Sequence, residues 1–307
     1  MKAIQYKDYG SSDVIEVVEI DIPTIRNDND VLIKIKAIGV NPVDVKIRTG
    51  LMKNIRPVTM PFIPGGEASG IISEIGANVS KYKVGDEVIA LTKTNGYAEY
   101  ITLSEDSLVL KPNTLTFQEA ASIGVNIGTA QSVLFTKGKL QKGDKILIQG
   151  AAGAVGGTMV QMAKEAGAFV YATASGTGLE LAKSLGADEV FDYKLQDIGD
   201  ILKNIDLVVD TAGGESQSNL FKVLKQNGKL LSIVTPPSKE LAEKFKVEAH
   251  FVASDISPQT IQNGIDLIRK GKLKPIVSKT FVLEEAAKAQ DFLMGGGVNG
   301  KIVLMVN

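Results

Sequence analysis

The sequence predicts an α/β protein in two parts: a β-rich first part, then a parallel sheet with helices on both faces. Three observations support this prediction. The chain has 307 residues, which is long for one hydrophobic core and suits two domains. Its first third contains short runs that alternate apolar and polar residues. From residue 145 onward, strand-like and helix-like segments follow one another in turn.

The first part is expected to be a compact, irregular barrel. Residues 15–22 (IEVVEIDI) and 31–40 (VLIKIKAIGV) alternate as half-buried strands do. Shorter strands are predicted in SGIISEIG, DEVIAL and YAEYITL, with turn signals at 83–86 (KVGD) and 94–97 (TNGY) between them.

The second part begins with helical patterns in TFQEAASIG and NIGTAQSVLFTKG. Strands are then predicted at 145–149, 169–174, 190–192, 206–210 and in KLLSIV, with helices between them. One of these helices is SQSNLFKVLKQNG, ending on Gly228. Such alternation predicts a parallel sheet that is buried on both faces.

After Ser257 the pattern adds a helix with Pro258 near its first turn and Gly271 past its end, a strand and helix in FVLEEAAKAQDFLMGG, and a closing strand, KIVLMVN. We expect that last strand to rejoin the first part. The predicted domains are therefore 1–119, 120–257, and a C-terminal return at 258–307.

Composition excludes several classes of function. The formal net charge is -1, so nothing indicates a nucleic-acid partner. The chain has no cysteine, which excludes disulfides, thiolate metal sites and cysteine nucleophiles. The single histidine, His250, is expected on a strand near the surface, and no GxSxG elbow accompanies it. Without a signal peptide or an apolar run of about 20 residues, we expect no membrane span and a cytoplasmic protein.

A glycine-rich loop follows the strand at 145–149. The stretch ILIQGAAGAVGG gives Ala151-x-Gly153-x-x-Gly156, in which alanine replaces the first glycine of the dinucleotide fingerprint. Gly153 and Gly156 have the spacing that lets the backbone approach a pyrophosphate, and the N-terminus of the next helix favours phosphate. A tight turn without a ligand is the alternative interpretation.

The end of the next strand, FVYATA, indicates which dinucleotide binds. NAD enzymes usually carry an acidic residue there, about 20 residues beyond the loop, to bind the ribose 2′-hydroxyl. Here Ser175 and Thr177 follow the strand, and the first acidic residue is Glu180. The missing acid favours NADPH. No Arg or Lys occupies the turn, so the preference over NADH need not be strict.

The stretches GVNPVDVKIRTG, PFIPGGEASGIISEIG, NGYAEY and NGKIVLMV, in this order and spacing, resemble the medium-chain dehydrogenase/reductase superfamily over essentially the whole chain. NPVDVK and VTPP are most similar to its zinc-free branch of NADPH quinone oxidoreductases and alkenal or enone reductases. The resemblance implies a GroES-like catalytic domain and a Rossmann domain. Dimers through a sheet edge are common in that family, and the resemblance admits a homodimer here without requiring one.

The resemblance also implies residue roles. Gly153, Ala154, Val155 and Gly156 would hold the pyrophosphate. Ser175 would lie at the 2′-phosphate, Tyr193 near the adenosine, and Thr129 on the nicotinamide side. Backbone groups of Ile233 and Val234 would bind the nicotinamide amide, Lys46 would touch both cofactor and substrate, and Asn41 would be an active-site amide. The alternatives stay open: Lys46 as a solvated surface cation, Tyr193 as a rim aromatic, Thr129 as a helix-start residue, and Asn41 as a turn former before Pro42.

No metal site is predicted. Zinc dehydrogenases of the superfamily carry ligands at positions that match Asn41, Pro42 and Gly66, and only Glu67 remains beside them. The expected activity is hydride transfer from NADPH to a quinone or to the activated C=C bond of an α,β-unsaturated carbonyl, with Lys46 or Asn41 stabilising the charge on the carbonyl oxygen. Alternatives are quinone reduction with only incidental enone reduction, and a non-catalytic NADPH-binding protein of crystallin-like or redox-responsive type.

Overall fold

The computed structural model describes the whole chain, residues 1–307. It divides into two compact units, Met1–Val125 with Pro275–Asn307 and the continuous segment Asn126–Lys274. The second unit extends beyond the boundary expected at residue 257 because helix α9 (Pro258–Arg269) packs into it: Gly264 lies against the side chain of Ile127. None of the helices is both long enough and apolar enough to span a bilayer.

The first unit is built on a seven-stranded sheet with the order β14-β15-β3-β4-β5-β7, in which β6 also pairs with β3; β1 and β2 form a separate antiparallel pair. Its elements are β1 (Lys2–Gln5), β2 (Glu16–Glu19), β3 (Asp30–Val40), α1 (Pro42–Arg48), β4 (Ala68–Ile75), β5 (Glu87–Ala90), β6 (Tyr100–Ser104), β7 (Leu108–Leu110), α2 (Phe117–Ala121), β14 (Val277–Val282), α10 (Ala286–Met294) and β15 (Lys301–Met305).

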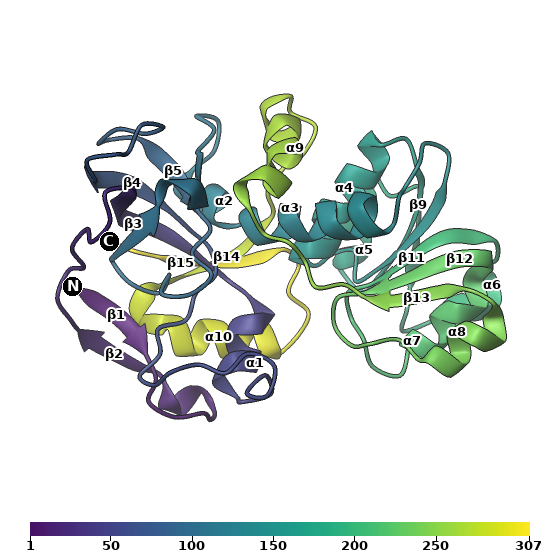
Figure 1. Ribbon diagram of the computed structural model, residues 1–307. Coiled ribbons are helices and arrows are strands. Elements are labelled where there is room, and N and C mark those ends of the chain that lie inside the picture. The colour runs from purple at the N-terminus through teal and green to yellow at the C-terminus, as the bar shows by residue number, and fades with distance from the viewer. The chain divides into compact units, whose positions relative to one another are not determined.

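The C-terminal strand rejoins the first unit, as the sequence predicts. Strand β15 pairs antiparallel with β3, with Ile302 opposite Val40. The yellow C-terminal elements therefore lie among the purple and blue elements of the N-terminal half (Figure 1). This pairing buries isoleucines of β3 and places Lys301 beside the residue that follows β3, Asn41.

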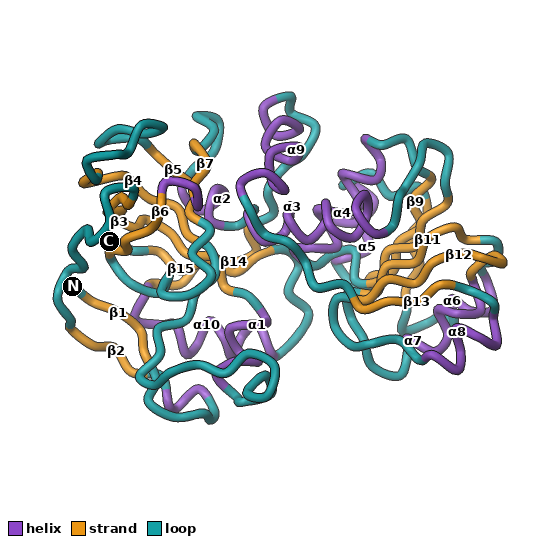
Figure 2. Tube along the Cα trace, in the orientation of Figure 1, coloured by secondary structure: helices purple, strands orange, loops and turns teal.

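The second unit contains a six-stranded sheet with the order β10-β9-β8-β11-β12-β13, and all its pairs are parallel. Helices lie on both faces of this sheet (Figure 2). Its elements are α3 (Gly124–Ala130), a π-helical stretch (Gln131–Lys137), β8 (Lys145–Gln149), α4 (Ala154–Glu165), β9 (Phe169–Ala174), α5 (Gly178–Ser184), β10 (Glu189–Asp192), α6 (Ile198–Ile201), β11 (Ile205–Asp210), α7 (Gln217–Leu220), β12 (Leu224–Ser232), α8 (Lys239–Phe245), β13 (Glu248–Phe251) and α9.

The strand order reverses between β8 and β11, because the chain runs outward from β8 on one side and from β11 on the other. In open parallel sheets, ligands bind outside the carboxyl ends of the strands at such a switch point. The predicted fold class, a β-rich GroES-like unit and a doubly wound Rossmann unit, is therefore confirmed.

One helix prediction is wrong in its extent. The predicted helix SQSNLFKVLKQNG ends at Val223, and Leu224 already begins β12. Gly228 does not end a helix: a Cβ there would lie 3.0 Å from the backbone oxygen of Ile205 on the neighbouring strand. Asn227 has a φ of 60°, so an irregular, tightly paired strand start replaces the expected last helical turns.

Candidate active site

The glycine-rich loop of the second unit has the geometry of a phosphate cradle. It joins β8 to α4, and Gly150 adopts a φ of +74°. A Cβ on Gly156 would lie 2.2 Å from the backbone oxygen of Gly150, so only glycine allows the loop to fold back this closely. Gly153 caps the helix without a side chain, and the N–H groups of the first turn of α4, including those of Ala154 and Val155, have no partner one turn earlier. The residues present therefore fit a dinucleotide phosphate.

The residues predicted for the adenosine end come together at the carboxyl end of β9. The hydroxyl of Ser175 donates a hydrogen bond to Tyr193 Oη at 3.2 Å. Tyr193 is 55% exposed, so its ring is available to a ligand. No carboxylate directly follows β9, because Gly176 and Thr177 separate Ser175 from helix α5.

The residues predicted for the nicotinamide end lie in the same unit. Thr129 is buried in α3, and Ile233 and Val234 form the bend after β12. The N–H of Ile233 donates to the carbonyl of Asp210, and the N–H of Val234 donates to Ser232 Oγ. Both carbonyl oxygens of the bend stay free to accept hydrogen bonds, which suits a carboxamide NH₂ donor.

The first unit contains a buried ion pair at Asn41. The Nζ atom of Lys301 lies 2.5 Å from Glu67 Oε1 and 2.6 Å from Asn41 Oδ1. The second carboxylate oxygen of Glu67 accepts the N–H of Val125 at 2.8 Å. Glu67 is 0% exposed and Lys301 3%. Three groups of complementary charge and polarity therefore satisfy one another away from water.

The amide of Asn41 is fully occupied in this arrangement. Its Nδ2 atom donates to the carbonyl of Gly39 at 3.3 Å and to Glu67 at 3.1 Å. Donation to a substrate oxygen would require one of these hydrogen bonds to break. The catalytic role predicted for Asn41 therefore stays a prediction. In the structure its side chain connects Gly39, Glu67 and Lys301.

Asp44 is a buried residue of helix α1 that contacts Asn41. Its carboxylate accepts the backbone N–H of Asn41 at 2.9 Å and the hydroxyl of Tyr97 at 3.1 Å. Burial raises the pKa of Asp44 to about 6, and these two hydrogen bonds oppose that rise. The two hydrogen bonds tie the start of α1 to the segment that contains Tyr97.

Lys46, the other predicted catalytic residue, has no hydrogen-bond partner for its side chain, unlike Asn41 and Asp44. It is half-buried on α1, and its ammonium has no hydrogen-bond or ion-pair partner in the chain. A cation that is partly desolvated and unpaired can still interact with an oxyanion or a phosphate.

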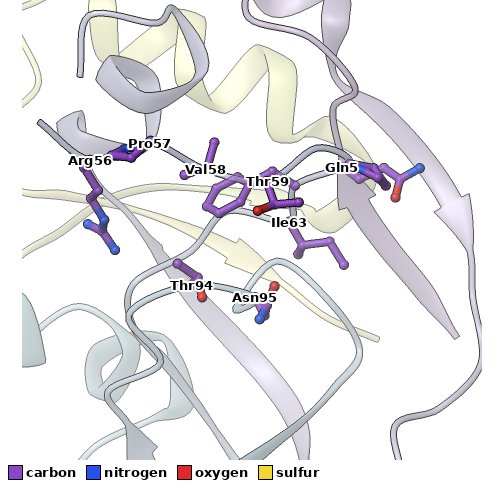
Figure 3. Close-up of a pocket in the computed structure, with 10 residues that line it drawn as sticks. Gln5, Arg56, Pro57, Val58, Thr59, Ile63, Thr94 and Asn95 are labelled. Carbon is purple, nitrogen blue, oxygen red and sulfur yellow. The ribbon is translucent and has the colours of Figure 1, made fainter. Parts of the chain in front are cut away.

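The first unit also contains a pocket of about 490 Å³ (Figure 3). The backbone of Asn95 donates to the carbonyl of Ile63, and Arg56 Nη2 donates to the carbonyl of Lys93, so its two walls are tied together. The turn that carries Thr94 also hydrogen-bonds through Thr92 to the carbonyl of Gly66, next to Glu67. The lining is mixed polar and apolar: Gln5, Arg56, Pro57, Val58, Thr59, Pro61, Phe62, Ile63, Thr94 and Asn95.

Sequence reasoning missed several buried charged residues, among them Lys301 and Asp210. Lys301 lies within NGKIVLMV, a motif that carries the family resemblance, but the resemblance implied no role for this lysine. Asp210 ends the apolar run DLVVD, and a charged residue at the end of a fully buried strand was the available signal. The structure contains no group of three or more His, Cys, Asp or Glu side chains that could hold a metal ion.

Comparison with known proteins agrees with this geometry. Residues 27–140 match the model of the alcohol dehydrogenase GroES-like domain, and residues 185–304 match that of the zinc-binding dehydrogenase family. The quinone oxidoreductase of Mus musculus is 31% identical over 329 residues, covering 100% of this chain and 98% of that protein.

Two further proteins are similar over nearly the whole chain. The chloroplastic NADPH-dependent alkenal/one oxidoreductase of Arabidopsis thaliana is 34% identical over 322 residues, covering 99% of this chain and 79% of that protein. The solved structure of the quinone oxidoreductase from Coxiella burnetii superposes with a TM-score of 0.91 at 30% identity, covering 100% of this chain and 99% of that one.

The fold, the phosphate cradle and these similarities define an NAD(P)-dependent oxidoreductase. The chain belongs to the medium-chain dehydrogenase/reductase superfamily, in the branch of quinone oxidoreductases and alkenal or enone reductases.

Proposed function

We propose that this protein is a zinc-independent, NADPH-dependent oxidoreductase that reduces a quinone or the activated C=C bond of an enone or enal. The observation that supports the zinc-independent part is the Lys301 ammonium, which contacts Asn41, a position that the resemblance matches to a zinc ligand, and Glu67, the residue after another such position. The names of two similar proteins, a quinone oxidoreductase and an NADPH-dependent alkenal/one oxidoreductase, support the substrate class.

NADPH, when bound, supplies the hydride that reduces the acceptor. Gly153, Ala154, Val155 and Gly156 would hold its pyrophosphate, and Ser175 and Tyr193 its 2′-phosphate and adenosine. The protein's own task is to orient the acceptor and to stabilise charge. The Lys46 ammonium, which has no internal partner, would stabilise the negative charge that develops on the acceptor's carbonyl oxygen. Solvent would then supply the proton.

The acceptor would bind in the pocket between residues 56–63 and Thr94–Asn95 (Figure 3). Val58, Phe62 and Ile63 offer apolar contact to a ring or alkyl chain, and Asn95 and Thr59 offer hydrogen bonds. A mixed lining of this kind suits planar carbonyl compounds, which have an apolar body and polar ends.

A homodimer and a cytoplasmic location stay predictions. One of the similar proteins named above is chloroplastic, so family membership alone does not assign a compartment.

The direct test is NADPH oxidation by the purified protein with a panel of quinones, 2-alkenals and ring enones, each with and without EDTA. We expect turnover of at least one class, unchanged by the chelator, because no metal ligand set is present. EDTA-sensitive activity that Zn²⁺ restores would contradict zinc independence. Turnover of no acceptor would instead favour the non-catalytic NADPH-binding protein.

Ser175→Asp tests the cofactor preference. A carboxylate at the end of β9 would accept the ribose hydroxyl of NADH and repel the 2′-phosphate of NADPH. We expect the ratio of kcat/KM for NADPH to that for NADH to fall by about 10-fold or more, because like charges side by side disfavour the complex. Ser184→Asp, an exposed change of equal charge at the end of α5, should leave the ratio unchanged. Equal wild-type values for the two cofactors would contradict the preference.

Lys46→Met tests the charge-stabilising role. If the ammonium stabilises the oxyanion in the transition state, kcat and kcat/KM should fall together, by about 10-fold, since a flexible lysine is less preorganised than a rigid donor. Lys53→Met, an exposed change farther along the same segment, is the matched control. A higher KM for NADPH with unchanged kcat would assign Lys46 to cofactor binding. Unchanged constants would remove it from the active site.

A further inference from the structure

Asp210 is a buried carboxylate to which neither the sequence pattern nor the proposed mechanism gives a role. It ends β11 at the switch point of the parallel sheet and is 0% exposed. It lies in register with Gln149, the last residue of β8, and with Ser232, the last residue of β12. A charged side chain in this position requires partners.

Four donors satisfy the Asp210 carboxylate. Its Oδ1 atom accepts the N–H groups of Ala212 at 3.0 Å and Gly213 at 2.7 Å. Its Oδ2 atom accepts Gln217 Nε2 at 2.8 Å and Ser232 Oγ at 2.9 Å. The first pair of donors belongs to the loop after β11, and the second pair connects that loop to the end of β12.

The hydrogen-bond network continues into the bend after β12. Ser232 Oγ accepts the N–H groups of Val234 at 3.2 Å and Thr235 at 3.3 Å. Gln217 Nε2 also donates to the carbonyl of Thr235 at 3.2 Å. The conformation of the bend, and with it the direction of its free carbonyls, therefore depends on Asp210 through Ser232 and Gln217.

We infer that Asp210 is a positioning residue for the nicotinamide half of the cofactor. This inference rests on the proposed function, in which the bend at Ile233 and Val234 binds the nicotinamide amide. Asp210 does not touch the cofactor in this account. Its carboxylate orders the two loops that flank the switch point, so that the bend needs no rearrangement when the cofactor binds.

Binding of the two halves of the cofactor should depend on Asp210 to different extents. The adenosine half would be held by the loop after β8 and by Ser175 and Tyr193, none of which hydrogen-bonds to Asp210. Loss of the carboxylate should therefore weaken binding of the whole dinucleotide and spare binding of a fragment that lacks nicotinamide. Adenosine 2′,5′-bisphosphate is such a fragment.

Asp210→Asn is the test. A carboxamide keeps the size of the side chain but replaces one acceptor oxygen with an NH₂ group, so donors on that side lose their acceptor. The dissociation constants of NADPH and of adenosine 2′,5′-bisphosphate are measured by calorimetry. We expect the NADPH value to rise about 10-fold, as for loss of a charge-assisted hydrogen bond, and the fragment value to stay within about 2-fold.

Two further variants make the test decisive. Ser232→Ala removes the link between Asp210 and the bend and should show the same selective loss, even if Asp210→Asn does not fold. Asp188→Asn is the matched control, because Asp188 is also a hydrogen-bonded carboxylate of this unit but precedes the edge strand β10, whereas Asp210 ends the interior strand β11. It should change neither constant.

Equal loss of NADPH and fragment binding in the Asp210 and Ser232 variants, or unchanged NADPH binding in both, would overturn the inference and leave the proposed function intact. Wild-type protein that binds the fragment and NADPH equally would also overturn it. Wild-type protein that binds neither compound would contradict the proposed function, and this inference with it.

Discussion

The ion pair between Lys301 and Glu67 is the interaction on which the first unit depends. This unit is discontinuous in sequence, and its last strand must return to the first part of the chain. The pairing of β15 with β3 brings the Lys301 ammonium to two oxygens, those of Glu67 and Asn41, that have no access to water. Removing one partner of such a pair is strongly destabilising, because the other charge stays buried and unpaired.

The same ion pair limits the chemistry of the site. The Lys301 ammonium and the Asn41 amide are both occupied inside the unit, so neither is free to act as a strong donor to an acceptor. In the proposed mechanism this leaves the unpaired Lys46 ammonium for the developing charge. Asp210 has a comparable role in the second unit, where its buried carboxylate accepts hydrogen bonds from Gly213 and Ser232 and so orders the loops that contain them. In both units a buried charge would position groups that face the ligands.

The fold and much of the cofactor loop could be predicted from the sequence because they depend on local patterns. Alternating residues predict β3, and the spacing of Gly153 and Gly156 predicts the tight loop between β8 and α4. The start of β12 could not be predicted, because the helix-like residues 224–228 form an irregular strand start, in which Leu224 pairs with Ile205 and Asn227 adopts a φ of 60°. The contact of Lys301 with Asn41 joins residues 260 positions apart, and no local pattern contains that information.

The most direct test of this account is a double-mutant cycle of Lys301→Met and Glu67→Gln, followed by the free energy of unfolding in urea. Lys301→Met alone is expected to destabilise the protein by about 3–5 kcal/mol, because it leaves the Glu67 carboxylate buried without its cation. Adding Glu67→Gln is expected to restore at least about 1 kcal/mol of that loss, since neutralising the carboxylate removes the unpaired charge. Two single losses that simply add in the double variant, or a Lys301→Met variant as stable as the wild type, would contradict this account.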